Sequence, residues 1–281
     1  MITFFSVPKP WTGETARAQD NAVGSWRALG ADVILFGDEE GIAEAGERLG
    51  AAVVHGLERN AHGTPLLDGV FARAHELART DVLCFANADI VVTGELAGAA
   101  AAVARRAPRF VIVGESRDAA LTETLDFAGD WQARVRAAAR SGRRRGAGAL
   151  DWFCFSRGVY ESIPPFAVGR VGFDNWLVWH ARDTGATVVD ATRVVRPVHQ
   201  RHGYGHVPGG FEQTRRGAEA AENWRLAGGK RRIYTRFDAS HLLTPRGLRR
   251  NLGATLRAKE RLRKAIWKLR HGQLLPQRGP G

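Results

Sequence analysis

The stretch "DVLCFANADIVVTGEL", residues 81–96, combines a buried strand with side chains that can do chemistry. Its apolar residues 82–85 predict a strand, and the strand ends on Asn87 and Asp89. Oxygen ligands at a strand end can bind a divalent cation and, through it, a diphosphate. The structural alternative is that Asp89 caps the turn into the helix that begins near Gly94.

Two further predicted strands carry polar residues to their ends. The strand over residues 2–7 contains Ser6, with Lys9 just beyond it, and the next strand ends at Asp38. Ligands of an open parallel sheet bind beyond the carboxyl ends of its strands, so these residues should share one rim with Asp89. Polar groups that converge on one rim are suited to bind a nucleotide.

The sequence lacks the usual glycine-rich phosphate loops. No G-x-G-x-x-G follows the first predicted strand, and no G-x-x-x-x-G-K-[ST] occurs anywhere. A dinucleotide oxidoreductase or a P-loop enzyme normally holds its phosphates with one of these loops. We therefore expect a divalent cation on Asp89 to neutralise a diphosphate and to stabilise the charge that forms as it departs.

Short apolar runs alternate with helical patterns along the first part of the chain. Helical periodicity marks residues 14–29, 41–50, 65–78 and 95–106, and predicted strands fall between these segments. This alternation predicts βαβ units, and therefore an α/β fold with a mostly parallel sheet and helices on both faces.

The second part of the chain is organised differently. Residues 141–149, "SGRRRGAGA", predict a mobile loop, and the His/Gly-rich residues 199–210 predict another. Between them lie a predicted strand, a helix and a second strand, at residues 150–160, 174–185 and 186–195. A long basic helix is predicted over residues 246–270. We therefore expect one domain over residues 1–240 and a basic helical tail over residues 241–281.

The composition suits a globular chain. The 281 residues are 44% hydrophobic, and no apolar run reaches the roughly 18–20 residues of a membrane-spanning helix. The N-terminal "MITFFSVPKP" has no signal-peptide pattern, and Cys84 and Cys154 both lie in apolar runs. We therefore expect a cytoplasmic protein with two buried, reduced thiols.

Most of the net charge of +12 lies near the C-terminus. Residues 240–281 carry eleven Arg or Lys and one acid, a net +10, which leaves about +2 on residues 1–239. A near-neutral body with a basic tail is typical of a domain with an anchor for an anionic surface, and no known nucleic-acid-binding module is present. We therefore expect no nucleic-acid partner.

The tail also has an apolar stripe, which comprises Leu248, Leu252, Leu256, Leu262, Ile266 and Leu269. With the surrounding Arg and Lys, this stripe predicts a helix on an anionic membrane surface, and so a peripheral protein on the inner face of the membrane. The alternative is a helix that docks on the body through the same stripe.

The order of these elements resembles the nucleotide-sugar-binding half of the GT-A glycosyltransferases. Several segments together are similar to an uncharacterised glycosyltransferase-like family of that fold: "FFSVPKPW", "QDNAVGSW", "FGDEEG", "GTPLLDGVF", "NADI", "FAVGRVGFDNWLV", "VVDAT" and "HQRHGYGH". The similarity covers roughly residues 1–240. It implies a nucleotide-diphosphate sugar as donor and a saccharide or other hydroxyl compound as acceptor.

In this superfamily a D-x-D element at the position of "NAD" holds Mn²⁺ or Mg²⁺ on the donor diphosphate. The resemblance therefore makes Asp89 a metal ligand and assigns Ser6, Asp38 and Asn87 to the donor. Asn87 replaces the first acid of the element, which usually faces the ribose or the sugar. This difference from the D-x-D pattern weakens the expectation that the protein depends on a metal. An amide can still form hydrogen bonds there.

The resemblance also implies a histidine after the last core strand as a ligand of the metal or of the diphosphate. It favours His199, with His202 as the alternative. Together with His206, their spacing would also allow a zinc site on one helical face, but Gly203 and Gly205 disfavour a helix there. The remaining alternative is a set of surface histidines in a loop.

Asp174, in "VGFDNWL", is the candidate catalytic base. In inverting GT-A enzymes, a carboxylate at the start of a late helix takes the proton of the acceptor hydroxyl, and Asp174 matches that place and residue type. The structural alternative is an N-cap, which contributes about 1 kcal/mol to a helix.

Four other residues are assigned by their place in this scheme. Asp151 and Trp176 belong to the acceptor side, where Trp176 and Trp179 would offer a surface for sugar stacking. Arg170 would contact a phosphate or an acidic sugar of the donor. The alternatives are a core position for the tryptophans and a structural ion pair for Arg170.

We therefore expect a metal-assisted, inverting glycosyltransferase. One alternative is a sugar-nucleotide nucleotidyltransferase, although "SVPKPWTGETAR" lacks the Gly/Arg-rich loop that normally follows the first strand of those enzymes. The other is a non-catalytic nucleotide-sugar-binding protein, an alternative that Asn87 favours.

Overall fold

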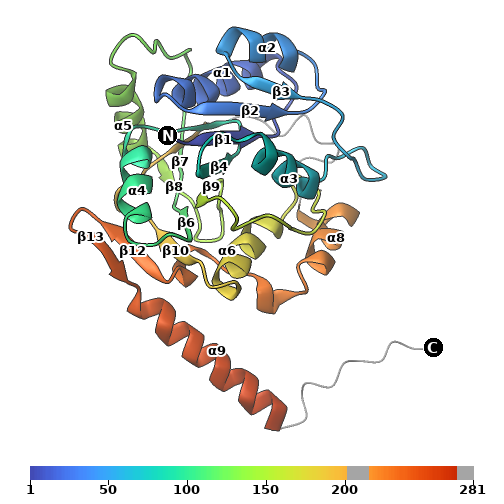
Figure 1. Cartoon of the computed structure of the whole chain (residues 1–281), viewed down its shortest axis with the longest axis vertical. Helices are drawn as coiled ribbons and strands as arrows, with labels where there is room; N and C mark the ends of the chain where they lie inside the picture. The colour runs from blue at the N-terminus through green and yellow to red at the C-terminus, as the bar shows by residue number, and fades with distance from the viewer. Residues whose placement is uncertain (201–214, 271–281) are drawn as a thin grey trace.

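The computed structural model describes residues 1–200 and 215–270 and has an α/β architecture (Figure 1). Its main sheet has nine strands in the order β13-β12-β10-β6-β9-β4-β1-β2-β3. They are β1 (Thr3–Ser6), β2 (Asp32–Phe36), β3 (Ala52–Val54), β4 (Val82–Ala86), β6 (Phe110–Val113), β9 (Trp152–Ser156), β10 (Thr187–Asp190), β12 (His241–Thr244) and β13 (Gly247–Arg250). Only the pairs that involve β9 or β13 are antiparallel, so the prediction of a mostly parallel sheet is confirmed.

Helices cover both faces of the main sheet, as predicted. They are α1 (Gly13–Ala28), α2 (Ile42–Leu49), α3 (Leu67–Leu77), α4 (Glu95–Ala104), α5 (Trp131–Ser141), α6 (Phe173–Asp183), α8 (Ala218–Leu226) and α9 (Leu252–Arg270), with short 3₁₀ turns η1 (Lys230–Arg232) and η2 (Arg236–Asp238). One apolar layer contains Trp26 of α1, and the other contains Phe71 of α3 and Leu177 of α6. Successive residues of β1 enter opposite layers, since Phe4 stacks on Trp26 while Phe5 meets Phe71 edge-on.

β9 runs against its neighbours and therefore brings its first residues to the carboxyl edge of the sheet. It lies between β4 and β6, with Cys154 directly opposite Cys84. Both cysteines are buried and form no disulfide. Because β9 is antiparallel, Asp151 at its start lies beside Asn87, whose N–H donates to the Asp151 carbonyl at 2.9 Å.

A second sheet of four strands contradicts the prediction of a mobile loop at residues 141–149. Its order is β5-β11-β7-β8, with β5 (Ile90–Val91), β7 (Arg117–Ala119), β8 (Arg143–Arg144) and β11 (Val198–Gln200). The loop prediction was wrong because it weighed only glycine and local charge. β8 pairs with β7, and its arginines find acidic partners from elsewhere in the chain. The loop predicted over residues 199–210 begins with β11, and residues 201–210 lie outside the described part.

The C-terminal helix begins later than the sequence pattern predicts. Residues 241–250 form a β-hairpin, in which β12 extends the main sheet beside β10, and α9 starts only at Leu252. The segment "TPRG" turns the chain between the two strands, with Gly247 at a φ of 103°. Leu248 therefore belongs to a strand and not to the predicted helical stripe.

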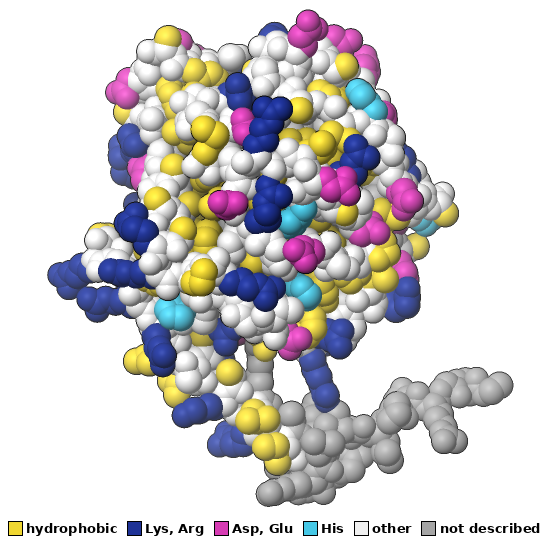
Figure 2. All heavy atoms as spheres, viewed as in Figure 1, with side chains coloured by type: hydrophobic (Ala, Val, Ile, Leu, Met, Phe, Trp, Pro, Cys, Tyr) yellow, Lys and Arg dark blue, Asp and Glu magenta, His cyan; other side chains and the backbone are white. Residues whose placement is uncertain are grey.

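α9 projects away from the rest of the chain and exposes apolar residues (Figure 1, Figure 2). Leu252, Leu256, Leu262 and Ile266 are 72, 67, 62 and 40% exposed. The alternative of a helix docked on the body through this stripe is therefore wrong for these four residues. None of the helices in the described ranges is both long and apolar enough to cross a membrane.

Candidate active site

The small sheet gathers segments that leave the carboxyl ends of the main strands. β5 follows β4, β7 follows β6 and β11 follows β10, so each lies beyond the edge at which parallel-sheet ligands bind. His199 of β11 is paired with Ile90 on one side and with Asp118 on the other. Residues that are far apart in the sequence thereby come together.

Asp89 is buried in this cluster between two nitrogen-bearing side chains. Its Oδ2 lies 3.8 Å from Nζ of Lys9 and 3.8 Å from Nε2 of His199. Burial lowers the pKa of Lys9, and the Asp89 carboxylate opposes that shift. The structure thus brings Asp89 and His199, the two predicted metal ligands, to one place, and it adds the amine of Lys9.

His199 has a second acidic neighbour on the other side of its ring. Its Nδ1 lies 3.2 Å from Oδ1 of Asp118. A carboxylate beside one ring nitrogen orients the imidazole and directs the other nitrogen, here Nε2, toward a metal. Asp118 is itself held by Arg143, at 2.5 Å from its Oδ2, and by Arg145, at 3.2 Å from its Oδ1.

Asp89 and His199 fit a divalent cation as two of its ligands. Their facing atoms are 3.8 Å apart, a span that an ion with ligands at about 2.1 Å can bridge. Within residues 1–200 and 215–270, no three His, Cys, Asp or Glu side chains form a complete metal site. A metal at this position would take its other ligands from the diphosphate, from water or from segments outside the described residues, to which His202 belongs.

Arg145 connects this group to the predicted acceptor side. Its guanidinium contacts Asp118 and also lies 3.5 Å from Oδ1 of Asp151, a buried residue at the start of β9. The other oxygen of Asp151, Oδ2, has no hydrogen-bond partner among the described residues. A buried carboxylate oxygen with spare capacity can accept a hydrogen bond from a hydroxyl of a ligand.

Asp174 lies in the first turn of α6 and has a raised pKa. Its Oδ1 accepts the N–H of Asn175 at 2.9 Å, and Gly172 occupies the N-cap, so the N-cap alternative for Asp174 is wrong. Burial raises the pKa of Asp174 to about 7, and the Asp151 carboxylate adds to the shift. A carboxylate whose pKa lies near the working pH is suited to take a proton from a hydroxyl.

The raised pKa predicts that ionised Asp174 destabilises the fold. The folded pKa of about 7 lies above the ordinary value of 3.8, so wild-type stability falls as pH rises between these values. Asparagine cannot ionise, so Asp174→Asn does not lose this stability. We therefore expect the difference in unfolding free energy, Asp174→Asn minus wild type, to become more positive as pH rises through this window, by at most about 4 kcal/mol at about 1.4 kcal/mol per pKa unit. Urea unfolding at about pH 4 and about pH 8 measures it, and an equal difference at both would contradict the pKa shift.

Asp38 occupies the rim beyond β2, on the predicted donor side. Its carboxylate oxygens accept the N–H of Gly56 at 3.2 Å, and Oδ1 lies 3.0 Å from Nδ1 of His55. The guanidinium of Arg59 lies 3.9 Å from Oδ2. Asn87 is half-buried just beyond β4. These residues place polar side chains at the rim that the sequence assigned to the nucleotide.

Ser6, Arg170 and Trp176 make structural contacts in place of the predicted ligand contacts. Ser6 is fully buried, and its hydroxyl donates at 2.6 Å to the carbonyl of the last residue of β4. Arg170 pairs with Glu219 of α8 at 2.7 Å, which is the structural alternative named for it. Trp176 is buried and stacks on His180, with the ring centres 4.6 Å apart, so it offers no surface to a sugar.

Two residues of the site, Asp118 and Arg145, were not among the predicted site residues. Asp118 follows β6, and the rule that finds Asp89 could have found it, since polar residues beyond a strand end face the same rim. Arg145 carries no local signal, because its partners Asp118 and Asp151 come from other segments.

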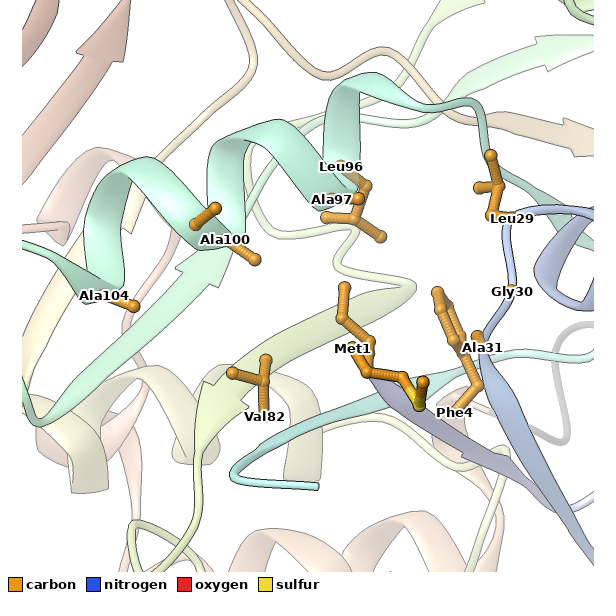
Figure 3. Close-up of a pocket in the computed structure, with 12 residues that line it drawn as sticks. Met1, Phe4, Leu29, Gly30, Ala31, Val82, Leu96, Ala97, Ala100 and Ala104 are labelled. Carbon is orange, nitrogen blue, oxygen red and sulfur yellow. The ribbon is translucent and has the colours of Figure 1, made fainter. Parts of the chain in front are cut away.

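An apolar pocket of about 280 Å³ lies at the opposite edge of the sheet (Figure 3). Met1 and Phe4, Val82 at the start of β4, and Ala100 and Ala104 of α4 are among the residues that line it. The parallel strands begin at this edge, and no acidic or basic side chain of the described residues lines the pocket. The polar cluster at the carboxyl edge is therefore the candidate active site.

No protein-family model and no curated protein matches the sequence. Solved structures match its fold. Glucosyl-3-phosphoglycerate synthase from Mycobacterium tuberculosis, in complex with Mg²⁺ and uridine diphosphate, is 12% identical over 82% of this chain and 80% of the synthase, with a TM-score of 0.50. Its complex with Mn²⁺, UDP-glucose and phosphoglyceric acid is 11% identical, with the same coverage and TM-score. The chain has the GT-A fold.

The GT-A fold confirms the expectation of fold class drawn from the sequence. A crystal structure of residues 1–349 of S. aureus TarS is 15% identical over 72% of this chain and 59% of that chain, with a TM-score of 0.40. At 11–12% identity, the likeness to the synthase establishes the fold alone. The chemistry of this GT-A chain has to follow from its own side chains.

Proposed function

We propose that this GT-A chain is a glycosyltransferase, which moves a sugar from a nucleotide-diphosphate sugar to a hydroxyl acceptor. One observation carries the proposal: a cluster suited to a metal and a diphosphate lies beside a carboxylate whose pKa is about 7. Arg145 joins the two parts, because it contacts both Asp118 and Asp151. Sugar transfer requires that a diphosphate be bound and a proton be accepted at neighbouring positions.

In this proposal the donor diphosphate binds beside Lys9, Asp89 and His199. Structures of the Mycobacterium tuberculosis synthase contain Mg²⁺ with UDP, and Mn²⁺ with UDP-glucose, and their shared fold supports a similar donor here. Asp89 and His199 would hold Mn²⁺ or Mg²⁺, which supplies positive charge to the phosphates and to the departing diphosphate when bound. The side chain of Lys9 adds a cation that belongs to the protein.

We propose that the nucleoside of the donor binds at the end of the rim beyond β2. Asp38 and His55 offer it a carboxylate and an imidazole, and Asn87 offers its amide to the ribose or the sugar. Ser6 supports these residues from beneath, since its hydroxyl ties β1 to β4.

Asp174 is the proposed base in an inverting displacement. The acceptor oxygen attacks the anomeric carbon while its proton passes to the Asp174 carboxylate. The bond between the anomeric carbon and the diphosphate oxygen breaks, and its electron pair leaves on the diphosphate. Arg145 holds Asp151 beside the acceptor through Oδ1, and Oδ2 of Asp151 accepts a hydrogen bond from a hydroxyl of the acceptor.

The proposal is tested by measuring nucleoside diphosphate release from UDP-, GDP- and CDP-sugars in the presence of Mn²⁺. We expect slow hydrolysis of one class of donor and faster release with an acceptor. Binding without hydrolysis or transfer would support the non-catalytic alternative. Pyrophosphate release from a nucleoside triphosphate and a sugar 1-phosphate would support the nucleotidyltransferase alternative.

Asp118→Asn is expected to weaken Mn²⁺-dependent binding of a nucleoside diphosphate about 10- to 100-fold, the usual effect of removing the partner of a metal-binding histidine. The reason is that the Asp118 carboxylate, 3.2 Å from Nδ1, directs Nε2 of His199 toward Asp89. Calorimetric titration with and without Mn²⁺ measures the effect. Asp183→Asn removes an exposed acid from α6 and serves as the control. An unchanged response to Mn²⁺ would leave Asp118 with a structural role only.

We further propose that α9 attaches the protein to an anionic membrane surface. Leu256 and Leu262 are exposed. Figure 2 shows hydrophobic side chains beside Lys and Arg on the coloured part of this helix, a combination that suits the interface of a bilayer. Replacing both with Asn should lower affinity for phosphatidylglycerol vesicles at least about 10-fold, because two buried leucines contribute several kcal/mol. Vesicle sedimentation measures this effect. The control is Leu77→Asn, at a leucine that is 43% exposed on α3, and equal binding by all three proteins would refute the anchor.

A further inference from the structure

A polar cavity of about 350 Å³ lies at the end of β10. Four arginines from four segments line this arginine pocket: Arg144 of β8, Arg193 after β10, Arg236 of η2 and Arg257 of α9. Like charges that converge on one space repel one another unless negative charge compensates them.

Carboxylates of the protein compensate the two arginines nearest the sheet. Arg236 is 7% exposed and donates to Oδ2 of Asp190 at 3.1 Å. Arg144 pairs with Glu115 at 3.0 Å, and Arg236 lies 3.8 Å from the same carboxylate. Both acids follow or end strands of the main sheet, so this half of the pocket is built into the fold.

The other two arginines are compensated less well. Arg257 lies 3.7 Å from Asp238, and Arg193 is exposed and forms no ion pair within residues 1–200 and 215–270. Among the residues that the structure describes, the four guanidinium groups therefore face three carboxylates, so positive charge is in excess by one. A concave site with net positive charge and several N–H donors favours an anion.

Two further features prepare the pocket for an anion. The guanidinium groups of Arg236 and Arg257 lie 4.4 and 5.7 Å from the ring centre of Phe237. Stacking on a ring occupies the face of a guanidinium and leaves the N–H groups at its edge available. Asn251, which also lines the pocket, immediately precedes the 19-residue helix α9, so the positive end of the helix dipole lies at the same space.

The arginine pocket adjoins the candidate active site through β8. Arg144 lines the pocket, and the next residue, Arg145, contacts Asp151. The main sheet has the order β10-β6-β9-β4 in this region. Asp89 follows β4, Asp151 immediately precedes β9, and the pocket lies at the end of β10, so Asp151 lies between the pocket and Asp89. A molecule in the pocket would therefore approach Asp151 from the side opposite to the proposed donor.

We propose that the arginine pocket binds a phosphate group carried by the acceptor. The forked guanidinium groups match the geometry of phosphate oxygens. The assignment to an acceptor rests on the proposed function, whereas the affinity for phosphate rests on the charge and geometry of the pocket alone. The phosphate belongs to a soluble phosphomonoester or to a lipid headgroup, since α9 begins beside the same pocket.

The test is a calorimetric titration of inorganic phosphate into the full-length protein saturated with UDP, at constant ionic strength. We expect binding by the wild type, and an affinity about 10-fold lower in Arg144→Gln and in Arg193→Gln. Both side chains are exposed, so their replacement leaves the buried Arg236 in place. Arg73→Gln, at an exposed arginine of α3 outside the pocket, is the matched control. No binding by the wild type, or equal binding by the wild type, Arg144→Gln and Arg193→Gln, would overturn the proposal.

Two further titrations distinguish the sources of the phosphate. Glycerol phosphate represents the soluble source, and phosphatidylcholine vesicles with and without phosphatidic acid represent the lipid source. The source whose binding depends on Arg144 and Arg193 is the one assigned, and binding of neither would overturn the proposal.

Failure of the proposed function would look different from failure of the arginine pocket. If the chain is not a glycosyltransferase, phosphate still binds in an arginine-dependent manner while no nucleotide sugar binds or reacts. If the pocket is wrongly assigned, UDP binds and donors are hydrolysed while phosphate does not bind to the UDP-saturated protein.

Discussion

Asp174→Asn is expected to lower the turnover of sugar transfer by about 10²–10⁴ while the affinity for the nucleotide sugar stays the same. Asparagine keeps an oxygen for the N–H of Asn175, but it cannot accept a proton. The proposed base acts only in the transition state, so kcat and kcat/KM should fall together. Steady-state kinetics and calorimetric titration of the donor measure the two quantities separately.

The pH profile of the wild type is an independent check on this expectation. Only the ionised carboxylate accepts a proton, so turnover should rise with pH through about 7, where burial places the pKa of Asp174, and then level off. Asp174→Asn should lack this rise, while Asp183→Asn, at an exposed acid of the same helix, should retain it. Full activity of Asp174→Asn would mean that another group is the base.

Asp89→Ala is expected to remove the enhancement of nucleoside diphosphate binding by Mn²⁺. The loss should be at least about 100-fold, because Asp89 is proposed to touch the metal directly, whereas outer partners contribute about 10- to 100-fold. His199 would remain as a metal ligand without the carboxylate that lies 3.8 Å from it. Binding that does not depend on metal should persist through Lys9.

Calorimetric titration of the diphosphate with and without Mn²⁺ measures this effect. Asp81→Ala, at an exposed acid just before β4, is the matched control and should respond to Mn²⁺ like the wild type. The same response in Asp89→Ala would place the metal elsewhere. No response to Mn²⁺ in the wild type would instead make Lys9 the main cation of the site, in keeping with the departure at Asn87.

Chain order alone locates one side of the candidate site. Short apolar runs show where β2 and β4 end, and the topology of parallel sheets then places Asp38 and Asp89 at one edge. The proximity of His199 to Asp89 cannot be predicted in this way, because it depends on β11 lying between β5 and β7. No local pattern encodes that pairing, and only the resemblance to a family indicated His199.

The sequence patterns fail where a role depends on a distant partner. Residues 143–145 have the composition of a loop, yet they form β8 and its continuation because Glu115, Asp118 and Asp151 hold their arginines. Ser6 shows the converse, since its type and place suit a contact with a ligand while its hydroxyl donates a hydrogen bond to a carbonyl of β4. Alternation along a strand cannot distinguish a side chain that faces the rim from one that bonds to the next strand.

Thermal unfolding of the full-length protein with UDP, GDP or CDP, each with and without Mn²⁺, measures whether the carboxyl edge of the sheet binds a nucleotide. A ligand at about 100 times its Kd adds about 2.7 kcal/mol to the stability of the folded state, or roughly 5–10 °C in Tm for a chain of this size. A nucleotide-sugar site at the carboxyl edge predicts such a rise with one of the three diphosphates, larger with Mn²⁺ than without. No rise with any of them, in the presence or absence of Mn²⁺, would mean that this edge holds no nucleotide-sugar site.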